Sequence, residues 1–244
     1  MKNERPKAIR KPSNPIIAPK QIQEAVVVDG RCIIIGAGEF FGLKMLPEEG
    51  DLVIAADGGL DNLASGNNSI KPDILLGDFD SVNPDGEINF FNNKTVGLQT
   101  EIIPFPKEKD DTDMMLSVKE GYARGYRRFA IYGGTGDRPD HFVANLQTLV
   151  YLSRREARGW LFGKNYKITS VSNGKLNFNA RESAVISVFA FDGKAEYVNL
   201  TGLKYAMSGG TIPTDFPIGV SNQAVGGLIE IEVGRGTLIV IAYD

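Results

Sequence analysis

The sequence contains a single cysteine, Cys32, and a single histidine, His141, among its 244 residues. One thiol cannot form an internal disulfide, and one cysteine with one histidine cannot complete a zinc site. No apolar run approaches the roughly 18 residues that a membrane-spanning helix needs, and no apolar stretch near the N-terminus is typical of a secretory signal. We therefore expect a cytoplasmic protein with no membrane partner.

The composition is that of a globular protein, with 42% hydrophobic and 23% charged residues, and it excludes a collagen or a disordered chain. The net charge of −3 is uneven, because residues 1–24 carry six Lys or Arg and only two Glu. The acidic remainder argues against a nucleic-acid partner and favours a metal cation or a cationic substrate. The basic segment 1–24 is read as a flexible arm containing four prolines, with a nucleic-acid tail as the alternative.

Short apolar runs alternate with helical periodicity through the first two-thirds of the chain, which predicts a mainly parallel α/β sheet. Helices are expected after Thr112 and from Pro139, with Gly159 as the stop of the second helix. The predicted strands are Cys32–Ile35, Leu52–Ala55, Ile74–Leu76, Ile102–Phe105 and Phe129–Tyr132.

From about residue 165 onward the pattern changes to short alternating segments, which predicts a smaller antiparallel β-sandwich domain. Turns are expected at Asn173-Gly174, Asp192-Gly193 and Gly234-Arg235-Gly236. The expected division is an α/β nucleotide-binding domain at 25–164 and a β-domain at 165–244. The predicted strands of the β-domain are Lys167–Val171, Lys175–Phe178, Ala184–Phe189, Leu228–Val233 and Thr237–Ala242.

Ligands of open parallel sheets bind beyond the carboxyl ends of the strands, so the residues that follow each apolar run are the candidates for function. Gly36-Ala37-Gly38 follows the first run, and is either a phosphate-binding turn or a tight turn that needs glycine. Asp57-Gly58-Gly59 follows the second, where Asp57 is either a ligand-binding residue or a helix cap.

Carboxylates gather after the third and fourth runs. Asp78 and Asp80 can converge because Gly77 allows the chain to bend, and paired hard oxygens are what Mg²⁺ binds when it also holds phosphate. The alternative is a polar turn with a helix cap. Asp113 offers a further metal oxygen, and Lys109 beside it is a candidate phosphate partner.

The loop after the fifth run combines glycines, Arg138 and a helix start, which favours phosphate binding. Together these loops predict phosphoryl chemistry on a nucleotide with Mg²⁺. The sequence contains no Walker A motif, no kinase catalytic loop and no G-x-S-x-G elbow.

Five motifs in this order resemble the bacterial thiamine pyrophosphokinases. They are Asp57-Gly58-Gly59, Gly77-Asp78-Phe79-Asp80-Ser81, Lys109-Asp110-x-Thr112-Asp113, Gly133-Gly134-x-Gly136-x-Arg138-x-Asp140-His141 with Asn145, and Gly219-Val220-Ser221-Asn222. The resemblance covers about residues 30–244. It implies transfer of the pyrophosphoryl group of ATP to the hydroxyethyl oxygen of thiamine, by a homodimer that holds thiamine between the two domain types of different subunits.

The resemblance also implies roles for single residues. It assigns catalysis and Mg²⁺ binding to Asp78, Asp80 and Asp113, one of which accepts the proton of the thiamine hydroxyl. Thiamine binding falls to Ser221 and Asn222, and Tyr205 and Phe216 are alternative aromatic partners of the pyrimidine. The ATP site is formed by Asp57, Gly58, Lys109, Asp110, Thr112, Gly133, Gly134, Arg138, Asp140 and His141.

Three other functions remain as alternatives. A pyrophosphokinase for another small alcohol, such as a hydroxymethylpterin, would keep the acids but not the pair Ser221 and Asn222. A non-catalytic regulator would lack some of the acids. A metal phosphohydrolase would usually have more histidines or a second carboxylate cluster.

Overall fold

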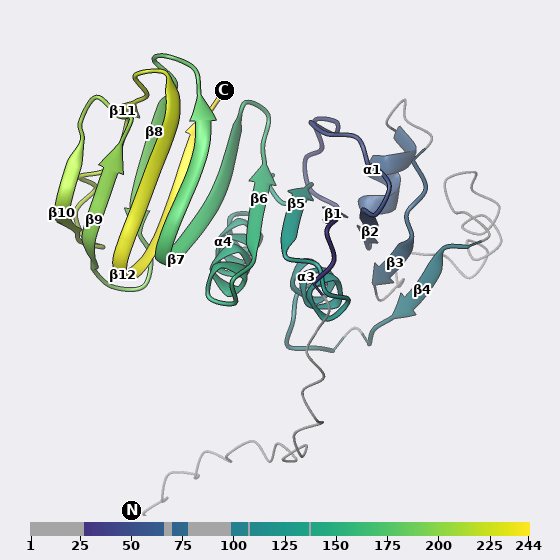
Figure 1. Ribbon diagram of the computed structural model, residues 1–244. Coiled ribbons are helices and arrows are strands. Elements are labelled where there is room, and N and C mark those ends of the chain that lie inside the picture. The colour runs from purple at the N-terminus through teal and green to yellow at the C-terminus, as the bar shows by residue number, and fades with distance from the viewer. Residues whose placement is uncertain (1–26, 66–69, 78–98, 107, 137) are drawn as a thin grey trace, which may run out of the picture.

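The computed structural model describes residues 27–65, 70–77, 99–106, 108–136 and 138–244. Its strands form one connected sheet in the order β10-β9-β12-β7-β6-β5-β1-β2-β3-β4, and β8 and β11 lie off this path (Figure 1). No helix in these ranges is long and apolar enough to span a membrane.

The first six strands run parallel, which agrees with the expected mainly parallel sheet, although only five of them were predicted. They are β1 (Arg31–Ile35), β2 (Leu52–Ala56), β3 (Ile74–Gly77), β4 (Glu101–Pro104), β5 (Arg128–Tyr132) and β6 (Arg158–Phe162). The chain moves outward from β1 to β4 and then returns to place β5 on the other side of β1. This reversal creates a topological switch point between β1 and β5.

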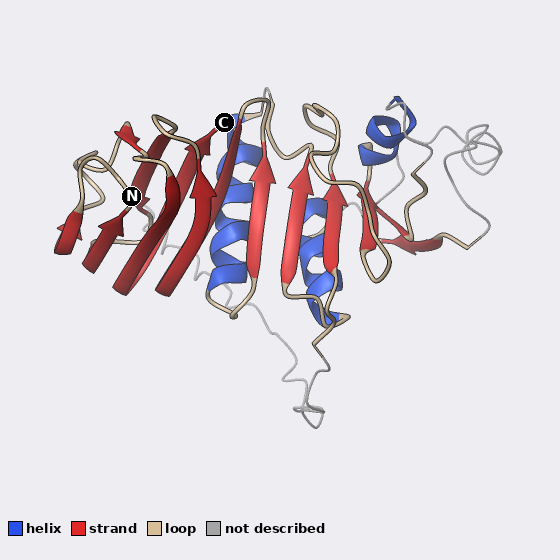
Figure 2. Ribbon diagram, turned by 45° about the horizontal axis from the view of Figure 1, so that its top comes forward, coloured by secondary structure: helices blue, strands red, loops and turns tan. Residues whose placement is uncertain are grey.

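Alternate residues of β1 enter two different cores, since successive side chains of a strand face opposite sides of a sheet. Cys32 and Ile34 pack with residues of α3 (Asp113–Ala123) and α4 (Pro139–Ser153). Ile33 and Ile35 pack instead with residues of α1 (Gly59–Ser65). Figure 2 shows α3 and α4 on the same side of the strands.

Both predicted helices are confirmed, and their starts have physical causes. Thr112 caps α3 by accepting a hydrogen bond from the Met115 N–H at 3.1 Å, and Pro139 begins α4. The predicted stop at Gly159 is wrong, because α4 ends at Ser153 and Gly159 lies in β6, a strand the sequence did not predict. Gly159 packs closely against α4, since a Cβ would lie 2.7 Å from Leu152 Cδ1 and would require that side chain to shift.

The remaining strands pair antiparallel. They are β7 (Tyr166–Ala180), β8 (Val185–Ala190), β9 (Ala195–Thr201), β10 (Met207–Ile212), β11 (Asn222–Gln223) and β12 (Gly227–Tyr243). Because β6 and β7 also pair, the ladder continues across the expected domain boundary, and the division into two domains stays a prediction.

Two predicted turns, at Asn173-Gly174 and Gly234-Arg235-Gly236, are wrong because both segments lie inside long strands. They form an irregularity at which the register of β12 on β7 shifts between Val233 and Thr237. Asn173 adopts φ 44°, and its Oδ1 accepts a hydrogen bond from the Gly236 N–H at 2.9 Å. The sequence signal for φ > 0 is therefore genuine, but it marks a bulge rather than a chain reversal.

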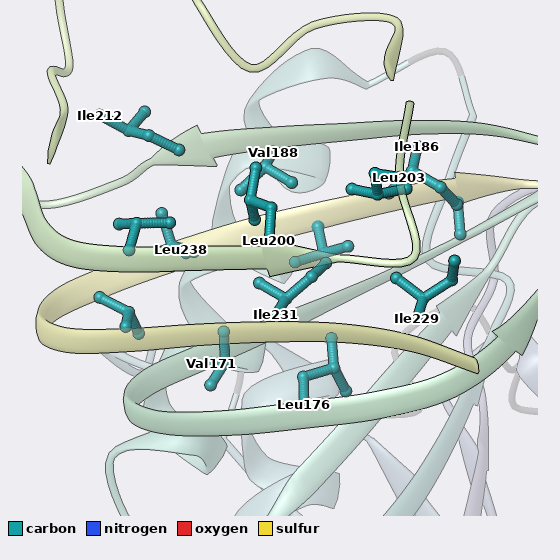
Figure 3. Close-up of a cluster of buried hydrophobic side chains, with 14 of the residues drawn as sticks. Val171, Leu176, Ile186, Val188, Leu200, Leu203, Ile212, Ile229, Ile231 and Leu238 are labelled. Carbon is teal, nitrogen blue, oxygen red and sulfur yellow. The ribbon is translucent and has the colours of Figure 1, made fainter. Parts of the chain in front are cut away.

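The bulge separates two halves of β12 that have different neighbours. Glu230–Arg235 pairs with β9, whereas Leu238–Ala242 pairs with β8. Side chains from β8 and β9, among them Val188 and Leu200, meet in one core over β7 and β12 (Figure 3).

Candidate functional site

A cavity of about 350 Å³ lies where the switch point predicts one, beyond the carboxyl ends of β1 and β5. The loops that follow β1, β2 and β5 and the first turns of α3 and α4 surround it. Its lining residues are Gly36, Ala37, Gly38, Ala56, Asp57, Thr112, Asp113, Met114, Gly133, Gly134, Thr135, Gly136, Arg138, His141 and Asn145.

The two glycine turns of the cavity pack directly on each other. The N–H groups of Gly36 and Gly38 donate to the carbonyls of Tyr132 and Gly133, at 2.8 and 2.9 Å. A Cβ on Gly38 would lie 2.3 Å from the Thr135 carbonyl oxygen, and one on Gly133, which has φ 62°, would lie 2.2 Å from that of Gly36. Glycine is therefore required here for close contact between the loops, and the N–H groups of Gly36 and Gly38 are engaged within the protein.

Two asparagines hold these turns by donating hydrogen bonds to their carbonyls: Asn62, which none of the motifs contains, and Asn145, which belongs to the fourth motif. Asn62 of α1 donates from Nδ2 to the carbonyls of Gly36 and Gly38, at 2.8 and 3.0 Å. The buried Asn145 of α4 donates from Nδ2 to the Gly134 carbonyl at 2.7 Å. Asn145 had a detectable signal, because it lies four residues after His141 and so on the same face of α4.

The acidic side of the cavity is formed by Asp57 and Asp113. Asp57 follows β2 with φ 47°, and its N–H donates to the Leu76 carbonyl at 2.7 Å, next to the end of β3. Asp113 is the first residue of α3, directly after the capping Thr112. Both residues line the cavity, Asp57 from the loop that follows β2 and Asp113 from the first turn of α3.

Lys109 does not line the cavity but contacts an acid that does. Its Nζ donates to Asp113 Oδ1 at 2.6 Å, and its side chain is only 14% exposed. Asp110 is exposed, and neither Asp110 nor Gly58 is among the lining residues. A Cβ on Gly58 would lie 3.1 Å from Ala37 Cβ.

The basic side of the cavity is formed by Arg138, which Asp140 holds in a bidentate pair at 3.0 and 2.6 Å. The hydrogen bonds from Arg138 lower the pKa of the Asp140 carboxyl well below its usual range. Asp140 does not itself line the cavity, whereas His141 in the first turn of α4 does. The N-terminal turns of α3 and α4 both face this space, and their dipoles favour an anion.

The other predicted residues lie elsewhere. Ser221 and Asn222 belong to the β-strand part of the chain, and among the described residues none after Asn145 lines the cavity. Asp78 and Asp80 lie outside the described residues.

A switch-point cavity with glycine turns, two helix N-termini and a fixed arginine defines a nucleotide-binding class of α/β protein, here joined to antiparallel strands. The comparisons with known proteins agree with this class. Residues 43–161 match the catalytic-domain model of thiamin pyrophosphokinase, and residues 174–238 match its vitamin B1 binding domain model. The chain belongs to the thiamine pyrophosphokinase family, whose members are transferases that make thiamine diphosphate from thiamine.

Individual relatives show the same likeness. The chain is 27% identical to the thiamine pyrophosphokinase of Bacillus subtilis over 195 residues, which are 80% of this chain and 88% of the relative. The crystal structure of a B. subtilis thiamine pyrophosphokinase superposes with a TM-score of 0.75 at 25% identity, covering 88% of this chain and 98% of that one. The thiamin pyrophosphokinase of Candida albicans shares the fold, with a TM-score of 0.69 at 16% identity over 97% and 98% of the two chains.

Proposed function

We propose that this protein transfers the pyrophosphoryl group of ATP to the hydroxyethyl oxygen of thiamine, giving thiamine diphosphate and AMP. The observation that carries the proposal is the cavity at the switch point, which is lined by Asp57 and Asp113 on one side and by glycine turns and Arg138 on the other. The family membership supplies thiamine as the acceptor.

ATP is proposed to lie against the loop that follows β5. Arg138 and the helix N-termini are suited to its phosphates, and Thr112, the N-cap of α3, also lines the cavity. Gly133 and Gly134 allow a ligand to approach the backbone closely, while Asp140 keeps the Arg138 guanidinium in place. The proposed ATP site is completed by Asp57, Gly58, Lys109, Asp110 and His141.

Mg²⁺ is the metal that the chemistry implies, and the oxygen donors present suit it. Asp57 and Asp113 both present carboxylates to the cavity, although the described residues contain no cluster of three or more possible ligands. Asp78 and Asp80, which follow β3 in the sequence, are proposed to complete the set with Asp113. When bound, Mg²⁺ neutralises charge on the phosphate oxygens.

The reaction is an in-line substitution at the β-phosphorus. The thiamine oxygen forms the new bond to phosphorus, the bond from the β-phosphorus to the bridging oxygen of the α-phosphate breaks, and AMP leaves with the electron pair. One of Asp78, Asp80 and Asp113 accepts the proton of the hydroxyl. Since the nucleophile is an unactivated alcohol, the side chains contribute mainly by positioning the reactants and balancing charge.

The second substrate is proposed to bind across a homodimer, with Ser221 and Asn222 of one subunit facing the cavity of the other. The cavity's lining, which among the described residues stops at Asn145, supports this arrangement. The single buried thiol, Cys32, suits a reducing cytoplasm, which is the proposed location.

The test is a product assay on purified protein with ATP, Mg²⁺ and thiamine. Thiamine diphosphate and AMP in equal amounts are expected. Thiamine monophosphate with ADP would rule out attack at the β-phosphorus. If AMP forms only when a different alcohol is supplied, the protein is a related pyrophosphokinase with another acceptor. Light scattering during gel filtration, at micromolar concentration, tests the homodimer.

A further inference from the structure

The turn Gly36-Ala37-Gly38, which lines the cavity directly after β1, is held by hydrogen bonds from two neighbouring segments. From α1, Asn62 Nδ2 donates to the carbonyl oxygens of Gly36 and Gly38 at 2.8 and 3.0 Å. From the loop that follows β5, carbonyls accept the N–H groups of Gly38 and Glu39 at 2.9 and 2.8 Å. Asn62 belongs to none of the five motifs, so the family resemblance gives it no role.

The packing of α1 brings Asn62 to this turn. Leu60 and Leu63 are buried in the same core as Ile35, which fixes α1 beside the end of β1. Gly59 begins α1, and a Cβ there would lie 1.9 Å from the Ile35 carbonyl oxygen, so only glycine permits this close approach. The Asn62 amide therefore reaches the carbonyls that follow Ile35 without any ligand being present.

The two hydrogen bonds from Asn62 also set the direction of backbone N–H groups in the turn. The peptide bonds of the described residues are trans, and in a planar trans peptide the C=O and the N–H point in opposite directions. In the peptide between Gly38 and Glu39, the oxygen faces Asn62 and the N–H donates to the loop after β5. The peptide between Gly36 and Ala37 is held by the same Nδ2 atom, so the Ala37 N–H also points away from α1.

The Ala37 N–H forms no hydrogen bond with another described residue, in contrast to the N–H groups of Gly36, Gly38 and Glu39. Ala37 is exposed and lines the cavity. A backbone N–H without a partner in such a position is a donor for an anion. Because the oxygens of Gly36 and Gly38 face Asn62, two partial negative charges are also kept away from that anion.

We infer that the Ala37 N–H donates a hydrogen bond to a phosphate oxygen of ATP, and that Asn62 is a positioning residue that fixes the direction of this N–H. The inference rests on the proposed function, in which the cavity holds ATP. It places an ATP contact on the loop after β1, which none of the five motifs contains. Without the Asn62 amide the two glycine carbonyls lose their donor, and the peptides can rotate until an oxygen faces the phosphates.

The first measurement is a two-dimensional ¹H–¹⁵N NMR titration of the full-length protein, with ATP and with inorganic triphosphate as separate probes. Both probes are expected to shift the Ala37 amide proton downfield, since a charge-assisted hydrogen bond to a phosphate oxygen deshields it. The amide protons of Gly36 and Gly38, already engaged within the protein, should move less. An Ala37 proton that does not shift at saturating ATP would overturn the inference, and a shift with ATP but not with saturating triphosphate would refute the phosphate contact.

The role of Asn62 is tested with Asn62→Leu, which has a similar volume but no donor. This variant is expected to raise the Kd and the KM for ATP about tenfold, to leave kcat and the KM for thiamine little changed, and to abolish the downfield shift of the Ala37 proton. Thr169→Val is the matched control, because the buried Thr169 Oγ1 also donates to a glycine carbonyl, that of Gly159 at 2.7 Å. It should destabilise the protein without changing the Kd for ATP.

Two outcomes would overturn the positioning role: an unchanged Kd for ATP in folded Asn62→Leu, or an equal loss of affinity in Thr169→Val. If Asn62→Leu does not fold, Asn62→Asp keeps the shape of the side chain, replaces the donor by an acceptor, and should raise the Kd at least as much.

Equilibrium dialysis with ATP separates failure of the inference from failure of the proposed function. Wild-type protein that binds ATP and shows the Ala37 shift, but forms no thiamine diphosphate, would refute the proposed reaction and still support the inference. Wild-type protein that binds no ATP would refute both.

Discussion

Lys109 Nζ and Asp113 Oδ1 lie 2.6 Å apart. Lys109, which was expected to bind phosphate, is therefore paired with Asp113, which was expected to bind the metal. The pair is partly shielded, with the Lys109 side chain 14% and the Asp113 side chain 32% exposed. The proposed binding of a metal–nucleotide complex would exchange the partners of this pair, with the lysine turning to phosphate and the aspartate to the metal. The charge of the pair is then balanced both before and after binding.

Lys109→Met is expected to raise the KM for ATP about tenfold, because it removes a charge-assisted contact to phosphate. The KM for thiamine should change little. Lys119→Met is the matched control, since Lys119 of α3 also pairs with an aspartate, Asp111, at 2.6 Å. An unchanged KM for ATP in Lys109→Met would exclude this contact.

Asp113→Asn is expected to lower kcat/KM at least 100-fold, because an amide is a far weaker metal ligand than a carboxylate. The fold should persist, since Asn is tolerated in a first helical turn. Asp111→Asn, two residues away and outside the cavity lining, should stay within about threefold of wild type. Near-normal turnover in Asp113→Asn, measured with saturating Mg²⁺, would remove Asp113 from the metal site.

Thr112→Ala is expected to destabilise the protein by about 1 kcal/mol, because the cap on the Met115 N–H is lost. Thr112→Ser keeps the hydroxyl and should lie within a few tenths of a kcal/mol of wild type. Urea unfolding measures both. Equal stability of the Ala and Ser variants would mean that this cap contributes nothing.

Gly133→Ala is expected to weaken ATP binding and to destabilise the fold by more than about 1 kcal/mol, because the residue needs φ 62° and its Cβ would clash with Gly36. Gly174→Ala is the comparison, since its nearest neighbour would lie at 3.4 Å, an ordinary contact. Calorimetry with and without ATP separates the two effects. A Gly133→Ala protein that binds ATP normally would show that the two loops can separate.

Asp51→Asn is expected to cost about 2 kcal/mol at neutral pH. Burial acts to raise the pKa of Asp51, but hydrogen bonds from the Arg31 side chain and N–H and from the Glu48 N–H outweigh it and lower the pKa. A lowered pKa in the folded state contributes stability above pH about 4, which is lost as the pH falls through the folded value. The difference between wild type and variant should therefore shrink below pH about 4 in urea unfolding; a constant difference would contradict the assignment.

The sequence predicted the elements whose signals are local. β1, β2 and β5 are continuous apolar runs, and α3 and α4 begin at a capping threonine and a proline. β6 was missed because Arg158, Gly159 and Trp160 show no alternation, and glycine there serves packing against α4. Asn173 was read as a turn because φ > 0 is common to turns and bulges, and only the partner strand distinguishes them.

The candidate site was predictable where topology alone gathers residues at one edge of a sheet, as for Asp57 and Asp113. It was not predictable where a side chain acts on a distant backbone. Asn62 lies 26 residues from Gly36, and no periodicity marks that contact. Asn222 was identified as important, but its hydrogen bonds to Tyr205 are visible only in three dimensions.

The position of β12 also has a consequence for synthesis of the chain. This strand pairs with β7, β8 and β9, all of which emerge earlier from the ribosome, and it contributes Ile229, Ile231 and Leu238 to the centre of their core. Strands β1 to β5 have their pairing strands already present once β6 is made, so they can fold with α3 during translation. The antiparallel strands must wait for β12 with their apolar faces uncovered, which makes this interval the step most exposed to aggregation and to capture by chaperones.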